Sequence, residues 1–136
     1  MTHSVFHDFG NLVITTDAAA AADAYSRGVQ LLIFSSAEAE AVLRDAVRAD
    51  PNFALATVAL GLAVDARGLA AEGHDRADRA DTTLAGATRR ERQHIEVIRL
   101  VLSGERERAA VLGREHLREF PNDVLVAHVL TSRGLD

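Results

Sequence analysis

The sequence predicts an all-α fold, and three observations lead to this prediction. Apolar residues make up 48% of the 136-residue chain, but aromatic residues make up only 4%. Alanine and leucine supply most of the apolar positions, and both favour helices, whereas strands are enriched in β-branched and aromatic residues. Apolar positions also recur at helical spacing along nearly the whole chain. The length suits a single core, so we expect one helical domain over residues 1–136, with an irregular segment at residues 1–16.

The composition excludes several classes of chemistry. The chain has no cysteine, so disulfides and a thiol nucleophile are ruled out. Its 15 basic residues are all arginine, and the absence of lysine excludes Schiff-base and P-loop chemistry. The net charge of −5 argues against non-specific binding to nucleic acid, which needs a basic face. Residues 1–16 carry no signal-peptide pattern and Asp65 and Arg67 interrupt the most apolar window. We therefore expect a cytoplasmic protein that does not enter the membrane.

The first two helices are predicted from apolar stripes and capping residues. Asp17 is placed to cap the first helix, and Ser35 with Glu38 matches a capping box for the second, which ends before Pro51. The first stripe consists of Tyr25, Gly28, Val29, Leu32 and Ile33. The second stripe consists of Ala39, Val42, Leu43, Ala46 and Val47. Only residues 11–15 have a pattern that could instead form a short strand.

The third and fourth helices differ in character. The third is expected over residues 53–67 and is apolar on two faces, which predicts that it is sandwiched between neighbours. The fourth is expected over residues 69–85. Its stripe holds mostly small residues, so we expect it to be the least stable helix. That stripe consists of Ala70, Gly73, Ala77, Ala80 and Leu84.

Three further helices complete the chain. Thr88 and Glu91 match a capping box that opens a helix ending at Leu102. The next helix is expected over residues 105–119, and the seventh starts after Pro121. The count is therefore about seven helices, which short connections would arrange in antiparallel pairs.

Small residues, glycines and prolines recur in a frame typical of tetratricopeptide repeats. The second helix of such a repeat needs a small residue, a bulky one, another small one and then proline, because small residues let paired helices approach closely. Positions in this frame are Ala39, Leu43, Ala46, Pro51, Gly61, Gly104, Ala109 and Pro121. Three positions depart from this frame. Thr57 stands where a large aromatic residue is expected, Gly113 where a bulky residue is expected, and His116 where a small residue is expected. The frame predicts a short right-handed superhelical array.

Longer stretches resemble the tetratricopeptide repeat protein 38 family. The matching stretches are residues 8–25, 49–55, 87–94, 103–104 and 116–123. They span essentially this whole chain and correspond to roughly the N-terminal third of the longer family. The resemblance implies an α-helical repeat fold and implies little about activity.

Glu91 and His94 are the strongest candidates for chemistry, because they lie one turn apart on the same helical face. A carboxylate-bridged di-iron site needs two such pairs and two further glutamates, and this chain offers one pair. We expect Glu91 to cap its helix and His94 to bond a neighbouring helix end, with no catalytic residue, metal or cofactor.

The other charged candidates also favour structural roles. His3 and His7 precede any clear helix, so a metal site there is not expected. His74 and Asp78 should form a solvated pair, and His116 and His128 should pack at helix interfaces. The arginine cluster over residues 89–92 surrounds a glutamate, which favours a salt-bridge network over a phosphate site.

The concave face of the expected array is the candidate binding surface. First helices line this face in repeat arrays. Frame counting places there Tyr25, Val29, Leu55, Val58, Leu62, Asp65, Glu91, His94 and Ile98. These residues fit core positions equally well, because a short array barely curves. The favoured function is a non-catalytic protein-interaction module or scaffold with a protein or peptide partner. The alternative is a small-molecule-binding protein or enzyme with a pocket near Glu91 and His94.

The seventh helix gives a further expectation. It is a first helix with no second helix after it, so its outer face should remain apolar. Two chains would pair there as a homodimer, or the chain is a fragment of a longer array. The residues expected at such a contact are Val124, Leu125, His128 and Val129.

Overall fold

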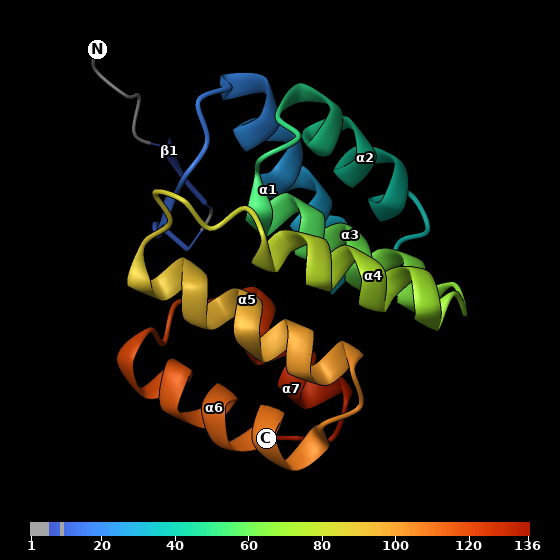
Figure 1. Cartoon of the computed structure of the whole chain (residues 1–136), viewed down its shortest axis with the longest axis vertical. Helices are drawn as coiled ribbons and strands as arrows, with labels where there is room; N and C mark the ends of the chain where they lie inside the picture. Colours follow the sequence, from blue (N-terminus) through green and yellow to red (C-terminus); the bar gives the residue numbers. More distant parts are fainter. Residues whose placement is uncertain (1–5, 9) are drawn as a thin grey trace.

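The computed structural model describes residues 6–8 and 10–136 and has an all-α architecture with one two-stranded ribbon (Figure 1). The all-α prediction is therefore confirmed. Over the described residues the elements are β1 (Phe6–His7), β2 (Val13–Ile14), α1 (Ala19–Ile33), α2 (Ala39–Ala49), α3 (Ala54–Ala66), α4 (Ala70–Asp81), α5 (Arg89–Leu102), α6 (Arg106–Glu119) and α7 (Val124–Ser132).

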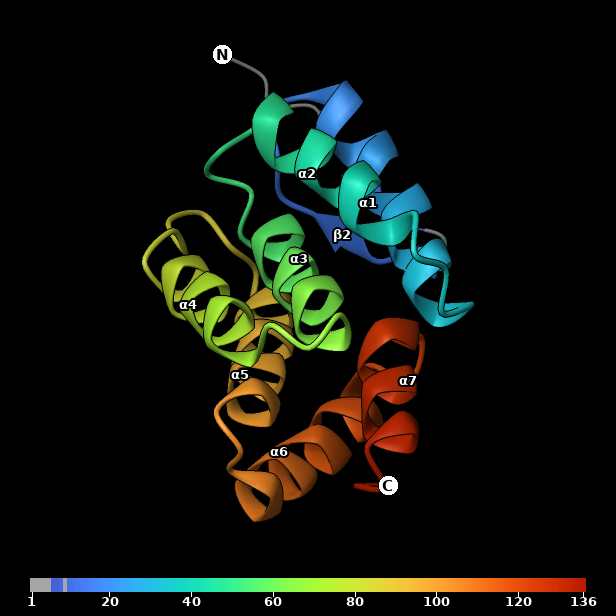
Figure 2. The same ribbon diagram turned by 90° about the vertical axis from the view of Figure 1, so that its right-hand side faces the viewer.

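Consecutive helices pack as antiparallel pairs, α1 with α2, α3 with α4 and α5 with α6. The pairs stack in chain order, because α2 contacts α3 and α4 contacts α5. The unpaired α7 returns against α5, α6 and the far end of the stack at α1 (Figure 2). None of the helices in the described ranges is both long and apolar enough to cross a bilayer.

The core centres on α3, the most apolar helix. Every residue of its Ala54–Val64 stretch is buried, which confirms that it is sandwiched between neighbours. The Phe53 ring at its start packs against the Tyr25 ring of α1, with 5.2 Å between the ring centroids. Four other helices, α1, α2, α4 and α5, contact α3.

Helices α3 and α4 approach each other closely at Gly61 and Gly73. A Cβ atom added to Gly73 would lie 2.8 Å from the Gly61 carbonyl oxygen and 3.0 Å from Asp65 Cβ. A Cβ atom at Gly61 would lie 2.9 Å from the Gly73 oxygen. The two helices therefore contact backbone to backbone, which explains why α4 carries so few large apolar side chains.

Two predicted helix caps are wrong. The N-cap residue of α1 is Ala18 rather than Asp17. The Ser35–Glu38 capping box does not form, because Ser35 closes α1 in the left-handed region with φ of 57° and Glu38 itself becomes the N-cap of α2. The serine that assists this turn is Ser36, whose hydroxyl accepts the Glu38 N–H at 3.2 Å.

Two other helix ends are informative. The capping box of Thr88 and Glu91 is confirmed in both of its hydrogen bonds. Helix α4 ends at Asp81, earlier than expected, because the Thr82 and Thr83 hydroxyls donate to carbonyl oxygens of its last turn.

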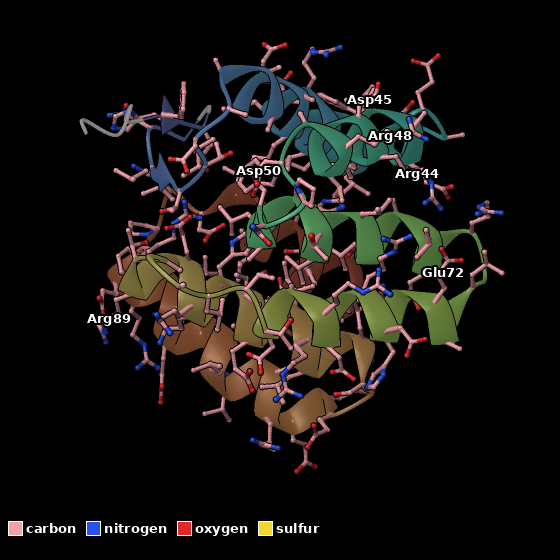
Figure 3. All side chains as sticks on the ribbon, turned by 45° about the horizontal axis from the view of Figure 1, so that its top comes forward. Arg44, Asp45, Arg48, Asp50, Glu72 and Arg89 are labelled. Carbon is pink, nitrogen blue, oxygen red and sulfur yellow. The ribbon has the colours of Figure 1, made fainter. Side chains whose placement is uncertain are left out.

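An ionic network links the outer helices at the edge of the molecule. Arg44 of α2 lies 3.2 Å from Glu40 of the same helix and 3.4 Å from Glu72 of α4, and Figure 3 shows Arg44 and Glu72 at this edge. Glu40 also pairs with Arg67 at 2.8 Å. The second helices of successive pairs are thus tied by charge as well as by packing.

Candidate functional site

Asp123 is the centre of a buried polar cluster. It is the N-cap residue of α7, where its carboxylate accepts the Val126 N–H at 3.4 Å, and it is 2% exposed. The same carboxylate lies 2.8 Å from Nδ1 of His94 on α5 and 2.7 Å from Nε2 of His116 on α6. We call Arg90, His94, His116 and Asp123 the Asp123 cluster. One side chain therefore joins three helices.

Positive charge surrounds this carboxylate. Burial by itself raises the pKa of Asp123, but the neighbouring His94, the hydrogen bond from His116 and the charge of Arg90 outweigh it. The net effect holds the pKa of Asp123 far below its usual range, so the group stays ionised. The Arg90 guanidinium lies 3.4 Å from Asp123 Oδ2 and also donates to the Val13 carbonyl at 2.6 Å. The cluster thereby reaches β2 as well.

The two histidines have different surroundings. Nδ1 of His116 lies 2.8 Å from the Gln93 Oε1 atom and its Nε2 lies 2.7 Å from Asp123, so both ring nitrogens of His116 have a hydrogen-bond partner. His94 donates from Nδ1 to Asp123, and its Nε2 atom is the one fully buried side-chain nitrogen or oxygen in the described ranges without a hydrogen-bond partner. His94 is therefore held by one side of its ring only.

The cluster also places three potential metal ligands within 4.8 Å of one another, on His94, His116 and Asp123. The nitrogen-to-oxygen distances of 2.7 and 2.8 Å are those of direct hydrogen bonds. Ligands of a tetrahedral zinc ion stand about 3.3 Å apart, given bonds of about 2.0 Å. Arg90 already compensates the single carboxylate, so a divalent ion would add uncompensated positive charge to a buried site. The chemistry fits an ion cluster better than a metal centre.

Glu91 and His94 point to different partners. Glu91 accepts the Thr15 N–H at 2.7 Å and the Thr15 hydroxyl at 2.5 Å while it completes the Thr88 capping box. We call this contact the Thr15–Glu91 strap, because it holds the end of β2 to the start of α5. Glu91 therefore caps its helix and His94 bonds the N-cap residue of α7, the two structural roles that the sequence predicted.

A groove outside the Asp123 cluster is lined in part by α7. It has a volume of about 650 Å³ and lies between the end of α1, the turn into α2, α3 and α7. We call it the α1–α3–α7 groove. Its apolar lining consists of Leu32, Ala37, Ala39, Leu62, Ala63, Ala66, Leu125 and Val129. Its polar lining consists of Ser35, Ser36, Glu40, Asp65, Arg67, His128, Ser132 and Arg133.

The charges at the rim of this groove are paired with each other. Asp65 of α3 lies 2.7 Å from Arg133 at the end of α7, and Arg67 lies 2.8 Å from Glu40. The hydrogen bond from Arg67 is the main reason that the pKa of Glu40 is below its ordinary value. Two acids and two bases leave the groove without net charge, although the chain carries −5.

The residues expected on the concave face divide into two groups. Leu62 and Asp65 line the α1–α3–α7 groove. The others are buried in the core or in contact with the Asp123 cluster and the strap: Tyr25, Val29, Leu55, Val58, Glu91, His94 and Ile98. Desolvation is the main cause that raises the pKa of Tyr25, and the nearby Asp123 charge adds to it, so this phenol stays protonated.

The residues expected at a self-association surface are mostly covered within the chain. Leu125 and Val129 are buried, and Val124 and His128 are half-buried. Three of the four, Leu125, His128 and Val129, line the groove. Because α7 returns against α5, α6 and α1, its apolar side chains do not form an outward-facing stripe.

The remaining charged candidates lie at the surface, apart from the buried Arg90 of the Asp123 cluster. His74 and Asp78 form a solvated pair at 3.5 Å, as predicted. In the arginine cluster, Arg89 pairs with Glu119 and Arg92 donates to backbone carbonyls. His7 is exposed in β1, and His3 lies outside the described residues.

A shallower hollow of about 470 Å³ lies between α5 and α6. Leu100, Val111 and Leu112 form its apolar part, and Val111 is 51% exposed. Glutamates flank it, and neither Glu91 nor His94 contributes to it or to the groove.

Sequence reasoning missed Arg90, His116 and Asp123 as members of one site. The signal for His116 was present, because a histidine replaces a small residue at a close helix contact, and a buried histidine needs a polar partner. The signal for Asp123 was its position just after Pro121, where an N-cap is expected. Their convergence could not be predicted, because it depends on how α7 returns against α5.

Comparison of the chain with protein-family models, with curated proteins and with solved structures finds no match.

Proposed function

We propose that this protein is a non-catalytic protein-interaction module of the tetratricopeptide-repeat type. Its α1–α3–α7 groove would receive a short apolar segment of a protein partner. The observation that carries the proposal is the groove itself, a hollow of about 650 Å³ with an apolar lining from α1, α2, α3 and α7. Antiparallel helix pairs and glycine contacts at Gly61 and Gly73 support the repeat type.

The polar groups of the groove favour a segment over a charged small molecule. A site for a charged ligand directs unpaired polar groups at it. Here Asp65 is paired with Arg133, and Glu40 is paired with Arg67. The floor residues Leu62, Leu125 and Val129 offer apolar contact instead.

The alternative, an enzyme that uses Glu91 and His94, is less well supported. Both side chains are buried, and each is bonded to a structural partner. A general acid or base must reach the substrate directly or through one water molecule. Neither residue lines the groove or the hollow between α5 and α6.

A random peptide library displayed on phage tests the proposed function. Peptides selected on the wild-type protein should contain apolar side chains, and in NMR titrations they should perturb amides around the groove. Ala66 is exposed and lines the groove, so Ala66→Trp should fill it without disturbing the core and should weaken binding about tenfold or more.

Ala71→Trp is the matched control, because Ala71 is an exposed alanine of α4 that does not line the groove. The control should bind the selected peptides like the wild type. Peptides that bind Ala66→Trp and the wild type equally well, or that perturb only amides near Glu91 and His94, would contradict the proposal.

A further inference from the structure

Phe34 is the most exposed large apolar side chain in the described part of the chain, at 81% exposure. It is the C-cap residue of α1. The next two residues, Ser35 and Ser36, line the α1–α3–α7 groove, so Phe34 stands beside the mouth of this groove. Ser35 adopts a left-handed conformation with φ of 57°, which turns the chain sharply at this point.

The same surface thus carries a protruding aromatic side chain and an apolar hollow. A two-fold symmetric contact uses the same patch on both subunits, so the patch must complement itself. A projecting group beside a hollow meets this condition, because the projection of each copy can enter the hollow of the other. The volume of about 650 Å³ is ample for one phenyl ring and part of its turn.

The charges of the groove indicate what kind of segment can bind in it. The chain carries −5, so two copies repel each other over most of their surfaces. The groove has no net charge, because Glu40 and Asp65 are paired with Arg67 and Arg133. The turn over residues 34–37 reads Phe-Ser-Ser-Ala and is also uncharged. A neutral turn therefore matches a neutral groove, whereas a strongly acidic or basic segment would gain no ionic contact there.

We propose that the partner segment that occupies the α1–α3–α7 groove is the Phe34 turn of a second copy of this chain. The resulting contact is a two-fold homodimer in which each Phe34 ring enters the other subunit's groove. This inference rests on the proposed function, because it names the occupant of the same groove. It differs from pairing through the outer face of α7, whose Leu125 and Val129 form part of the groove floor instead.

Sedimentation equilibrium over a concentration series tests the dimer. The wild-type chain should show a monomer–dimer equilibrium. Phe34→Ser, which removes the ring at an exposed position, and Ala66→Glu, which places a charge in the groove, should each raise the dissociation constant about tenfold or more. Val111→Ser is the matched control, because Val111 is also exposed but lies between α5 and α6, and it should leave the constant unchanged.

The salt dependence gives a second readout. Added salt screens the repulsion between two chains of charge −5, and the groove offers no ionic attraction for salt to weaken. The dimer should therefore become tighter as salt is added. A dimer that weakens with salt would overturn the proposed contact.

The absence of cysteine allows a direct test of the geometry. Ser36 belongs to the Phe34 turn and Ser132 to α7, and both line the groove, so a Ser36→Cys chain mixed with a Ser132→Cys chain should form a mixed disulfide between subunits. The same mixture with Phe34→Ser in both chains should form it much more slowly. Equal rates in the two mixtures would overturn the role of Phe34.

The outcomes separate this inference from the proposed function. A chain that is monomeric at every concentration, but whose selected peptides still lose binding in Ala66→Trp, overturns the dimer and leaves the interaction module standing. A chain whose dimer persists in both Phe34→Ser and Ala66→Glu overturns the Phe34 contact.

Discussion

Asp123 serves three helices with a single carboxylate. It caps α7 and accepts hydrogen bonds from His94 and His116 while Arg90 lies beside it. Removing one member of a buried charged network leaves the others uncompensated, which costs more than the loss of any single bond. This residue is therefore where we expect the largest single effect on stability.

Asp123→Asn should lower the free energy of unfolding by roughly 3 kcal/mol at neutral pH, as urea denaturation would measure. Asparagine still caps helices well, so the loss reports mainly the missing charge. Asp78→Asn is the matched control, because Asp78 sits in a solvated pair with His74, and it should change stability little. A loss no larger than that of the control would contradict the role given to the Asp123 cluster.

The same comparison has a defined pH dependence. The pKa of an unfolded aspartate is about 3.9, and the pKa of Asp123 in the folded chain is lower. The stability that its ionised form contributes is thus fully present above about pH 4 and is lost as the pH falls toward the folded value. The difference between wild type and Asp123→Asn should shrink when unfolding is followed below about pH 4. A difference that stays constant there would contradict the lowered pKa.

Helix α4 depends on backbone contact rather than on side-chain burial. Its buried residues are Gly73, Ala77 and Ala80. Gly73→Ala improves helix propensity by about 1 kcal/mol, but its methyl group would collide with Gly61 and Asp65 of α3. Overpacking costs about 1–3 kcal/mol, so the substitution should destabilise the protein and should speed amide exchange in α4.

Ala71→Gly in the same helix is the control, because it makes the reverse exchange at an exposed position. Ala71 is exposed, so this change should cost only the intrinsic propensity of about 1 kcal/mol and should leave α3 amides protected. If Gly73→Ala instead stabilised the protein, the close contact between α3 and α4 would be excluded.

The helices themselves were predictable because their signals are local. The apolar stripe of α1, the doubly apolar α3 and the Thr88–Glu91 capping box each depend on residues within one or two turns. The Ser35–Glu38 box failed although its spacing was right, because the left-handed turn at Ser35 left Glu38 as the N-cap. The bond between His94 and Asp123 and the Thr15–Glu91 strap join residues far apart in the chain, and no local pattern encodes them.

At the scale of the whole molecule, non-local contacts join the two ends of the helix stack. Repeat arrays are held mainly by contacts between neighbouring repeats, so their ends can unfold separately. Here the Thr15–Glu91 strap and the contact between Arg90 and Val13 fix the N-terminal segment to α5, and α7 touches α1. We therefore expect the chain to unfold as one unit.

Glu91→Ala should allow the N-terminal region to unfold before the rest of the molecule in a denaturation experiment. Tyr25 of α1 is the single tyrosine, and the chain has no tryptophan, so its fluorescence reports the surroundings of α1 and its contact with Phe53 at the start of α3. In the wild type the fluorescence and the helical circular dichroism should change at the same urea concentration. In Glu91→Ala the fluorescence transition should occur at a lower urea concentration than the circular-dichroism transition.

Thr88→Ala is the control, because it removes the cap of α5 but keeps the contact between Thr15 and Glu91. Its two transitions should shift together to lower urea. Two signals that remain coincident in Glu91→Ala would show that the strap does not couple the ends.

The shared carboxylate of Asp123 also has a consequence for how this sequence can evolve. His94, His116 and Asp123 are spread over 30 residues, yet both histidines bond to the Asp123 carboxylate, so the mutational effects at the three positions are strongly non-additive. A substitution at one of these positions changes the stability cost of substitutions at the other two. A second substitution in the cluster is therefore tolerated more readily after the first. The three positions should therefore drift together across descendants of this gene or remain fixed together, as one inherited unit.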